Sequence, residues 1–529
     1  MPCPRFRLQL HNGSIVVGTM EPARSQSALF QNRVSARPTP RACCTLCAPR
    51  SLAPTPNTHR SETKKLTSVL RTFYSVFCLL WLFLVVQAAQ AQFTYLTNNG
   101  TLTVTGYTGP GGNVVIPAAA NGLPVTAIGD KAFFANSDLI SVIIPDSITR
   151  IGNNAFFFCE NLASVTIPDK LTNIGEEAFY LCGSLRSITF PDSVSTLGDS
   201  AFAYCTSLTN AAIGNNVIAL GYRVFDSCYS LTNLVIGSNV ASIGDWAFSE
   251  CPGLSTITIP NSVTNVGYEA FFGCVSLTNV VIGNSVGNIG SFAFDRCASL
   301  AAIAVDPLNS FFSSLDGVLF NKNRTRLVKF PEGKSGSYTI PTGVIGIGDS
   351  AFVYSASLIG VAIPESVTSI GVLAFDQCSS LTNVEMGSGV TNIGNFAFDY
   401  CTNLAGVYFR GNAPFPGWNV FNSDNQATVY YLPGTLGWGT TYSNRPTAPW
   451  VLPQPVILTL VPGFGIQTNT FGFLISWATN ASVVVETSTA LSASTWNPVS
   501  TNTLTAGIAH FSDPDWTNYP ARFYRIRWP

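Results

Sequence analysis

An aliphatic residue followed by glycine recurs every 23 residues along most of this chain, and this period constrains the fold more than any other feature. The pairs are Ile128-Gly129, Ile151-Gly152, Ile174-Gly175, Leu197-Gly198, Leu220-Gly221, Ile243-Gly244, Val266-Gly267 and Ile289-Gly290, and then Ile347-Gly348, Ile370-Gly371 and Ile393-Gly394. In most copies a small residue and phenylalanine follow, as in Ala132-Phe133, and then cysteine and leucine. A period of about 20 to 50 residues is typical of architectures that stack one structural unit on the next. The sequence therefore predicts an elongated solenoid.

Each repeat contains an alternating apolar segment, such as Leu162-x-x-Val165-x-Ile167, with the period of two expected of a strand. Proline or glycine ends this strand at Pro145, Pro168, Pro191, Gly214, Gly237 and Pro260. Polar residues suited to the first turn of a helix follow the aliphatic-glycine pair, namely Asp130, Asn153, Glu176, Asp199 and Asp245. One repeat is therefore predicted to be a strand, a turn, a short helix with alanine and phenylalanine facing inward, and a second turn.

Cysteine occupies one repeat position in nine copies, at Cys159, Cys182, Cys205, Cys228, Cys251, Cys274, Cys297, Cys378 and Cys401. Export favours oxidation, and neighbouring coils could bring two such residues within disulfide reach. Stacked side chains nevertheless point the same way rather than toward each other, and a buried thiol behaves as a small apolar group. We therefore expect a reduced, buried column; a disulfide, a metal site or a nucleophile are the alternatives.

The array is interrupted where the strand-ending position moves from Asp306 to Pro341, a step of 35 residues instead of 23. Between them, residues 318–320 and 327–330 are apolar and flank the polar turn at 321–324, which predicts a β-hairpin in place of the helix. We expect this insertion, at about 306–341, to be an island on one face of a solenoid that spans 128–433. Residues 92–127 are predicted to be an N-terminal β cap.

Two further segments follow the repeats. Residues 434–454 are rich in proline and glycine and predict a linker. Over 455–529, the segments Phe473-x-Ile475-x-Trp477, Val483-x-Val485 and Tyr524-x-Ile526-x-Trp528 alternate as half-buried strands, which predicts a small all-β sandwich. Its pattern is weakly similar to fibronectin-type or immunoglobulin-like modules, and attachment to the envelope, carbohydrate binding or spacing are the roles considered for it.

The repeat string at 276–297, Ser-Leu-Thr-Asn-Val-x-Ile-Gly-x-x-Val-x-x-Ile-Gly-x-x-Ala-Phe-x-x-Cys, resembles the BspA-like leucine-rich repeat family. The resemblance covers about residues 93–433. It implies a leucine-rich repeat α/β solenoid, with a parallel β-sheet and short helices. It also implies a bacterial surface or secreted protein; some members of the family adhere to host or extracellular-matrix proteins, and most have no assigned ligand. A shared fold does not by itself establish a shared function.

The segment ahead of the repeats predicts export. Lys64, Lys65 and Arg71 precede an apolar run at 73–86, and Ala89-Gln90-Ala91 is the pattern that signal peptidase recognises. Residues 66–91 are thus predicted to be a signal peptide, cleaved after Ala91, of a secreted or cell-surface protein. An uncleaved membrane anchor is the alternative. Residues 1–65 are interpreted as a disordered or mis-started extension.

The part of the chain that follows the predicted cleavage site has few charged residues and a negative net charge. Charged residues make up 10% of the sequence, against about 25% in typical soluble domains. Residues 1–91 hold 11 of the 27 Lys and Arg and 2 of the 28 Asp and Glu, which leaves 16 − 26 = −10 for the remainder. Such a body is poorly matched to a phosphate backbone, so we expect no nucleic-acid partner.

Residues for catalysis are few. His510 is the one histidine that follows the predicted cleavage site, and its strand setting beside Phe511 favours a structural role over general base catalysis. Asp146, Asp169 and Asp192 recur just after the strand, but later copies carry Asn or Ser there, which favours turn formation over calcium binding or glycosidase chemistry. We expect no enzyme, no metal and no cofactor; a carboxylate-based hydrolase is the weakest alternative.

The outward positions of the strands are the candidate binding surface, on a sheet face expected to be concave. They carry Ser164, Thr166, Thr189, Asn210, Asn233, Val235, Thr258, Asn279, Val281, Asn383, Glu385 and Tyr408. A broad, uncharged surface of hydroxyls and amides suits an extracellular protein or glycan better than a small metabolite, which needs a deep pocket. Aromatic residues are sparse on it, so no strong glycan platform is predicted. An envelope structural or polysaccharide-associated module without a discrete partner is the alternative.

Overall fold

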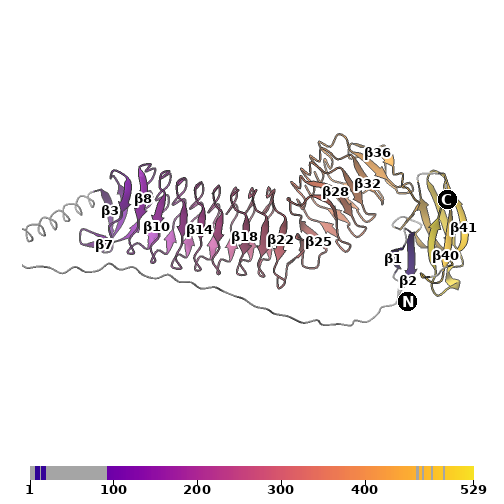
Figure 1. Ribbon diagram of the computed structural model, residues 1–529, viewed down its shortest axis with the longest axis horizontal. Helices are drawn as coiled ribbons and strands as arrows, with labels where there is room; N and C mark the ends of the chain where they lie inside the picture. The colour runs from indigo at the N-terminus through magenta and orange to yellow at the C-terminus, as the bar shows by residue number, and fades with distance from the viewer. Residues whose placement is uncertain are drawn as a thin grey trace, which may run out of the picture. The chain divides into compact units, whose positions relative to one another are not determined.

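The computed structural model describes residues 6–11, 14–19, 92–459, 464–467, 470–477, 480–492 and 495–528. Over these residues the chain is a stack of β coils followed by a small all-β module (Figure 1). The predicted signal peptide and the cleavage site after Ala91 lie outside the described residues. Two strands, β1 (Phe6–His11) and β2 (Ser14–Thr19), form a two-stranded sheet within the segment interpreted as disordered, which that interpretation did not foresee.

The stack begins with a group of strands over the predicted N-terminal cap. β3 (Phe93–Asn98) pairs antiparallel with β4 (Thr101–Tyr107), and β4 pairs parallel with β7 (Leu123–Ile128). β5 (Gly112–Val115) pairs with β8 (Leu139–Ile143), and β6 (Ala119–Ala120) pairs with β7. Phe93 covers the first ring of the core, with its centroid 6.4 Å from that of Phe133.

Each coil in the first part of the stack contributes two short parallel strands. The longer ones are β8, β10 (Ser164–Thr166), β12 (Ser187–Thr189), β14 (Asn210–Ala212), β16 (Asn233–Val235), β18 (Thr256–Ile259), β20 (Asn279–Ile282) and β22 (Ala302–Val305). The shorter ones, at the aliphatic-glycine pairs, are β9 (Arg150–Ile151), β11 (Asn173–Ile174), β13 (Thr196–Leu197), β15 (Ala219–Leu220), β17 (Ser242–Ile243), β19 (Asn265–Val266) and β21 (Asn288–Ile289). Partners lie one repeat apart, as in Asn210 with Asn233, so the predicted solenoid is confirmed.

The short helix predicted in each repeat is wrong. The part of the chain that the structure describes has one helix, a 3-10 turn at Trp516–Asn518, outside the repeats. In place of a helix, the backbone alternates between right-handed turns and left-handed residues such as Lys131 (φ 61°) and Ala135 (φ 55°). This alternation turns every second N–H toward the next coil: Lys131 N–H donates to Asn153 O at 3.0 Å and Phe133 N–H to Ala155 O at 2.7 Å. A helix would use those donors internally and leave the coils unjoined.

The residues predicted to cap that helix link coils instead. Asp130 Oδ1 accepts a hydrogen bond from Asn153 N at 2.8 Å, and Asn153 Oδ1 accepts one from Glu176 N at 3.1 Å. Asp199 and Asp245 make the same bond to Tyr222 N and Tyr268 N. The side chain therefore satisfies a backbone donor, as a cap does, but the donor belongs to the following repeat.

The core consists of columns of identical side chains. Phe156 and Phe179 stack with centroids 4.9 Å apart, Phe179 and Phe202 at 5.0 Å, and both contacts are nearly parallel. The nine cysteines are buried and unbridged, as predicted. Each thiol donates to the carbonyl oxygen of the phenylalanine 26 residues earlier, at 3.1–3.3 Å.

The insertion forms the predicted hairpin, but it is not an island on one face. β23 (Phe312–Leu315), β24 (Val318–Asn321) and β25 (Arg326–Lys329) pair antiparallel in order, and β25 then pairs parallel with β27 (Gly346–Ile347). Leu319 packs into the core before it, whereas Val318 and Phe320 pack into the core after it. The period of two in β24 thus sends alternate side chains to two cores, and the hairpin separates two half-solenoids.

The second half-solenoid has the same two-strand coils. Its longer strands are β26 (Gly336–Thr339), β28 (Leu358–Ile363), β30 (Asn383–Met386), β32 (Gly406–Phe409) and β34 (Thr428–Tyr431), and its shorter ones are β27, β29 (Ser369–Ile370), β31 (Asn392–Ile393) and β33 (Phe415–Pro416). The predicted linker at 434–454 is corrected, because β36 (Arg445–Pro449) pairs parallel with β34 and antiparallel with β35 (Thr441–Tyr442). This hairpin extends the sheet, so the proline-containing segment is the next-to-last strand of the sheet and not a spacer.

The C-terminal module contains two antiparallel sheets. One holds β37 (Val456–Leu458), β38 (Gly465–Gln467), β39 (Thr470–Ser476) and β42 (Ile508–Asp513); the other holds β40 (Ser482–Ser488), β41 (Asn497–Thr503) and β43 (Phe523–Arg527). Phe473 and Phe511 from the first sheet share a core with Val485 and Ile526 from the second.

Burial by itself would raise the pKa of Glu486 in this module, but hydrogen bonds from Arg527 and Arg525 outweigh the effect of burial and hold that pKa below its usual value. The fibronectin-like resemblance of this module stays a prediction.

Candidate functional site: the outward sheet face and its end patch

The outward sheet face is the row of exposed positions on the longer strands. Nine of the twelve predicted binding residues lie on the first half-solenoid, on β10, β12, β14, β16, β18 and β20, and the other three, Asn383, Glu385 and Tyr408, lie on β30 and β32 of the second. All twelve are exposed or half-buried, while most of the residues that alternate with them, such as Ile188 and Ile257, are buried. That these twelve residues bind a partner stays a prediction.

Register brings several of these residues together across neighbouring strands. Asn210 lies opposite Asn233, whose amide donates to the Asn210 side-chain oxygen at 3.3 Å, and Thr258 lies opposite Val281. The result on the first half-solenoid is a set of short, uncharged rows in which polar residues predominate and a few aliphatic ones, such as Ile143 and Val235, are exposed. Such rows offer hydrogen bonds, but no large side chain that would anchor a partner.

The second half-solenoid differs, because its outward face ends in five large side chains. This end patch consists of Glu385, Tyr408, Arg410, Tyr430 and Trp450. Tyr408 and Tyr430 are opposite each other on β32 and β34, and their rings stack with centroids 4.8 Å apart and planes within 9°. Trp450, one residue after β36, has its ring centroid 5.1 Å from that of Tyr408.

A charge pair completes the end patch. Arg410 Nε donates to Glu385 Oε1 at 2.7 Å, and the guanidinium carbon of Arg410 lies 5.3 Å from the centroid of the Trp450 ring. Both side chains of the pair remain about one-third or more exposed. Burial, and secondarily Tyr430, raises the pKa of Tyr408, so this phenol is neutral and a hydrogen-bond donor at neutral pH.

Small residues make room for the end patch. A Cβ at Gly406 would lie 2.6 Å from the Tyr408 ring, so the tyrosine leans over this glycine along its own strand. Gly360 lies opposite Asn383, and Ala448 lies opposite Tyr430. Glycine at position 406 therefore positions the Tyr408 ring, because any larger residue would displace it.

The sequence predicted two members of the end patch, Glu385 and Tyr408, and missed the other three. Tyr430 is paired in register with Tyr408, and the alternation of Val429 and Tyr431 around it is the signal that could have found it. Trp450 was missed because residues 434–454 were interpreted as a linker, so no residue of that segment was placed on the sheet face. The expectation that aromatic residues are sparse on the face is therefore wrong at this end.

The residues considered for catalysis have other partners or settings. Asp192 Oδ1 accepts a hydrogen bond from Asn215 N at 2.8 Å, and Asn215 Oδ1 accepts one from Ser238 N at 2.9 Å, so these side chains link successive coils instead of closing a local turn. His510 is an exposed residue of β42, opposite Leu474 of β39. Among the described residues, no three His, Cys, Asp or Glu side chains come together as a metal site would require.

These features define a class: strands and turns alternate and repeat every 23 residues to form a parallel β-solenoid. The family model of the BspA type leucine rich repeat region matches residues 126–255, 219–334 and 329–436, which is more than half of the chain. The chain therefore belongs to the BspA-type leucine-rich repeat family.

Solved bacterial structures are similar to the chain. A leucine rich cell surface protein from Faecalibacterium prausnitzii is 30% identical, with a TM-score of 0.48, and the match covers 64% of this chain and 86% of that one. A leucine-rich repeat protein from Bacteroides ovatus is 25% identical, with a TM-score of 0.40, over 60% and 93% of the two chains. A leucine rich repeat protein from T. pallidum is 32% identical, with a TM-score of 0.34, over 35% and 88%. None of the curated proteins compared with the chain matches it.

Among the described residues, none of the helices has the length and apolarity needed to cross a bilayer. The apolar run at 73–86 lies outside the described residues.

Proposed function

We propose that this chain is an exported or surface-attached adhesion protein that binds an extracellular protein through the outward sheet face, with the end patch as its main anchor. The observation that carries the proposal is the end patch itself, where Tyr408, Tyr430 and Trp450 cluster beside the exposed Arg410–Glu385 pair. Tyr, Trp and Arg are the residue types that dominate binding energy at protein interfaces. The polar rows on the first half-solenoid suit the surrounding contacts, which exclude water but contribute little energy.

The composition of the site favours binding over catalysis. Arg410 and Glu385 neutralise each other, so the end patch has no excess charge to attract a small ion. The face is broad and offers rows of hydroxyl and amide groups instead of a deep pocket. A protein partner can cover such a surface, whereas a small metabolite would stay mostly in solvent.

Surface plasmon resonance against a panel of immobilised extracellular-matrix proteins, fibronectin and laminin included, tests the proposal. We expect one of them to bind the full chain, and the double variant Tyr408→Ala with Tyr430→Ala to weaken that binding at least 10-fold. Both tyrosines are half-buried on the face, so thermal unfolding is measured alongside binding to check that the variant folds.

Tyr229→Ala is the matched control, because Tyr229 is 49% exposed and lies in a turn away from the outward sheet face. We expect this variant to bind within 2-fold of the wild type. The proposal is wrong if no protein of the panel binds, or if the tyrosine pair and Tyr229 have equal effects.

A further inference from the structure

A cavity of about 180 Å³ lies at the junction of the two half-solenoids. We call it the junction cavity; it is walled by residues 289–295 of the last coil of the first half, by Arg326, Val328 and Lys329 of β25, and by residues 348–350. It occupies the place where the turns of one more coil would stack. The hairpin replaces that coil without filling this space.

The backbone bonds between coils stop at this cavity. One repeat earlier, Glu269 N–H donates to Ser291 O at 3.1 Å and Phe271 N–H donates to Ala293 O at 2.9 Å. The equivalent N–H groups of Phe292 and Phe294 find no acceptor among the described residues. Both residues line the cavity, so two donors are left available at its wall.

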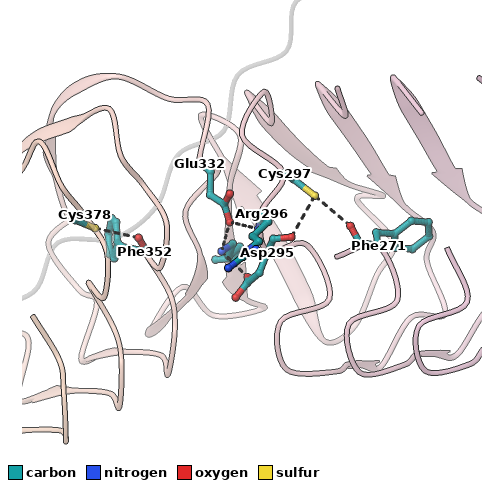
Figure 2. A network of polar contacts seen from close by, with 8 residues as sticks. Phe271, Asp295, Arg296, Cys297, Glu332, Phe352 and Cys378 are labelled. Atoms are coloured by element: carbon teal, nitrogen blue, oxygen red, sulfur yellow. Dashed lines mark hydrogen bonds and ion pairs between the residues drawn. The ribbon is translucent and has the colours of Figure 1, made fainter. Parts of the chain in front are cut away.

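A buried carboxylate oxygen in the same wall also lacks a partner. Lys329 Nζ lies 2.7 Å from Asp295 Oδ1 and 3.1 Å from Glu332 Oε1, and Arg296 N–H donates to Glu332 (Figure 2). Asp295 is 2% exposed, and its Oδ2 has no hydrogen-bond partner. A buried acceptor without a donor costs free energy, so a donor that reaches Asp295 Oδ2 from the cavity would stabilise it.

The charges that line the cavity balance. Asp295 is paired with Lys329, and Asp349 Oδ2 lies 3.6 Å from Arg326. A ligand that is itself charged would upset this balance. A neutral ligand with hydroxyl groups fits better, because a hydroxyl donates to Asp295 and also accepts from a backbone N–H.

A row of aromatic side chains leads along the turns to the cavity. This edge row consists of Tyr222, Trp246, Tyr268 and Phe292, in four successive coils, with neighbouring ring centroids 5.0–5.8 Å apart and planes at 71–87°. Phe292 is both the last ring of the row and part of the cavity wall. The Arg223 guanidinium carbon lies 5.2 Å from the Tyr222 ring centroid and 5.3 Å from that of Trp246, so the aromatic contact area nearest the polar cavity is that of Tyr268 and Phe292.

We propose that the junction cavity and the edge row bind a neutral oligosaccharide, with one sugar unit in the cavity and the following units along the row. The cavity is smaller than pockets for drug-sized ligands, which are about 300–1,000 Å³, and suits a single sugar ring. This site lies on the turns and not on the outward sheet face, so it is independent of the proposed adhesion.

Isothermal titration calorimetry of the full chain with cellohexaose, maltohexaose and chitohexaose tests the proposal. We expect one of the three to bind, and Ser291→Tyr to weaken that binding at least 10-fold. Ser291 lines the cavity, and tyrosine is already tolerated at its repeat position in Tyr222 and Tyr268. Those two rings contact the aromatic residue of the following coil, so the introduced ring would enter the space that the missing coil leaves empty.

Glu176→Tyr is the matched control, because Glu176 is the exposed residue at the same repeat position in a distant coil. We expect this control to bind as the wild type does, Tyr268→Ala to weaken binding 2- to 5-fold, and Tyr408→Ala with Tyr430→Ala to leave it unchanged. The proposal is overturned if no hexasaccharide binds, if Ser291→Tyr binds normally, or if the end-patch variant alone abolishes binding. Because Ser291 lies outside the outward sheet face, we expect Ser291→Tyr to bind matrix proteins as the wild type does, which keeps this test separate from that of the adhesion proposal.

Discussion

Single side chains in this solenoid contact the same residue type one coil before and one coil after. Phe225 illustrates this, since it is fully buried between Phe202 and Phe248, with centroids 5.5 and 5.6 Å away. Removing such a ring leaves a cavity that two neighbours border. The sequence made this packing predictable, because phenylalanine at a fixed interval can only stack if the coils are in register.

The first prediction concerns that column. We expect Phe225→Ala to lower the free energy of unfolding by about 3–5 kcal/mol, the usual cost of deleting a buried ring. Urea denaturation of the full chain, followed by circular dichroism, measures it. Tyr229→Ala, at an exposed site in the same coil, is expected to stay within about 0.5 kcal/mol of the wild type. Equal losses in both variants would contradict the stacked column.

The second prediction concerns the cysteines. Burial raises the pKa of the Cys159 thiol to about 12 and raises that of Cys228 and Cys251 well above the ordinary value. The thiolate is the reactive form, so these residues should resist alkylation in the folded chain. We expect mass spectrometry after iodoacetamide treatment at pH 8 to find all nine repeat cysteines unlabelled without denaturant and labelled in urea. Labelling of the native chain, or disulfides between these residues, would show that the column is open or oxidised.

At the scale of elements, the strands were predictable and the turns were not. Alternation at Leu162, Val165 and Ile167 identifies the longer strand, because burial on one side of a sheet imposes a period of two. The turns require left-handed backbone at Glu177 (φ 52°) and Leu181 (φ 59°), residue types that favour helices. Bonds to the next coil offset the strain of that backbone, and this contribution from a neighbouring repeat is invisible in the local sequence.

The hairpin holds the two half-solenoids together through a buried charge cluster and a stacked arginine. Lys329 of β25 and Glu332 meet Asp295 from the preceding coil, and the Arg296 guanidinium carbon lies 5.4 and 5.2 Å from the ring centroids of Phe272 and Tyr354, one in each half. One cation serves two buried carboxylates. Burial, opposed in part by Lys329, raises the pKa of Glu332 to about 7.

The third prediction follows from this pKa. Because the folded chain holds the Glu332 proton up to about pH 7 while the ordinary pKa is 4.5, the folded state binds more protons between these values and stability falls as pH rises through them. A shift of this size corresponds to about 3 kcal/mol. We expect the wild type to lose about that much stability relative to Glu332→Gln between pH 4.5 and pH 7.5, measured by urea denaturation. A difference between the two proteins that does not change with pH would refute the raised pKa.

In the whole molecule, the repeats stack in steps of 23 residues, and this stacking places the residues of both proposed sites. The end patch joins Tyr408 to Tyr430 and to Trp450 from the following hairpin, and the junction cavity exists because one coil is replaced. The outward face was predictable from alternation. The cavity and the full end patch were not predictable from the sequence. Both lie where the repeat is interrupted or ends, and there the 23-residue period no longer predicts the structure.

The most direct measurement of that stacking is pyrene excimer fluorescence on the outward sheet face. Pyrene maleimide is attached to Asn210→Cys with Asn233→Cys, which lie opposite each other on β14 and β16, after Cys3, Cys43, Cys44, Cys47 and Cys78 are replaced by serine. We predict strong excimer emission for this pair and none for Asn210→Cys with Asn279→Cys, which is three repeats away in the same row. Monomer emission alone from the first pair, or equal excimer emission from both, would contradict stacking in register.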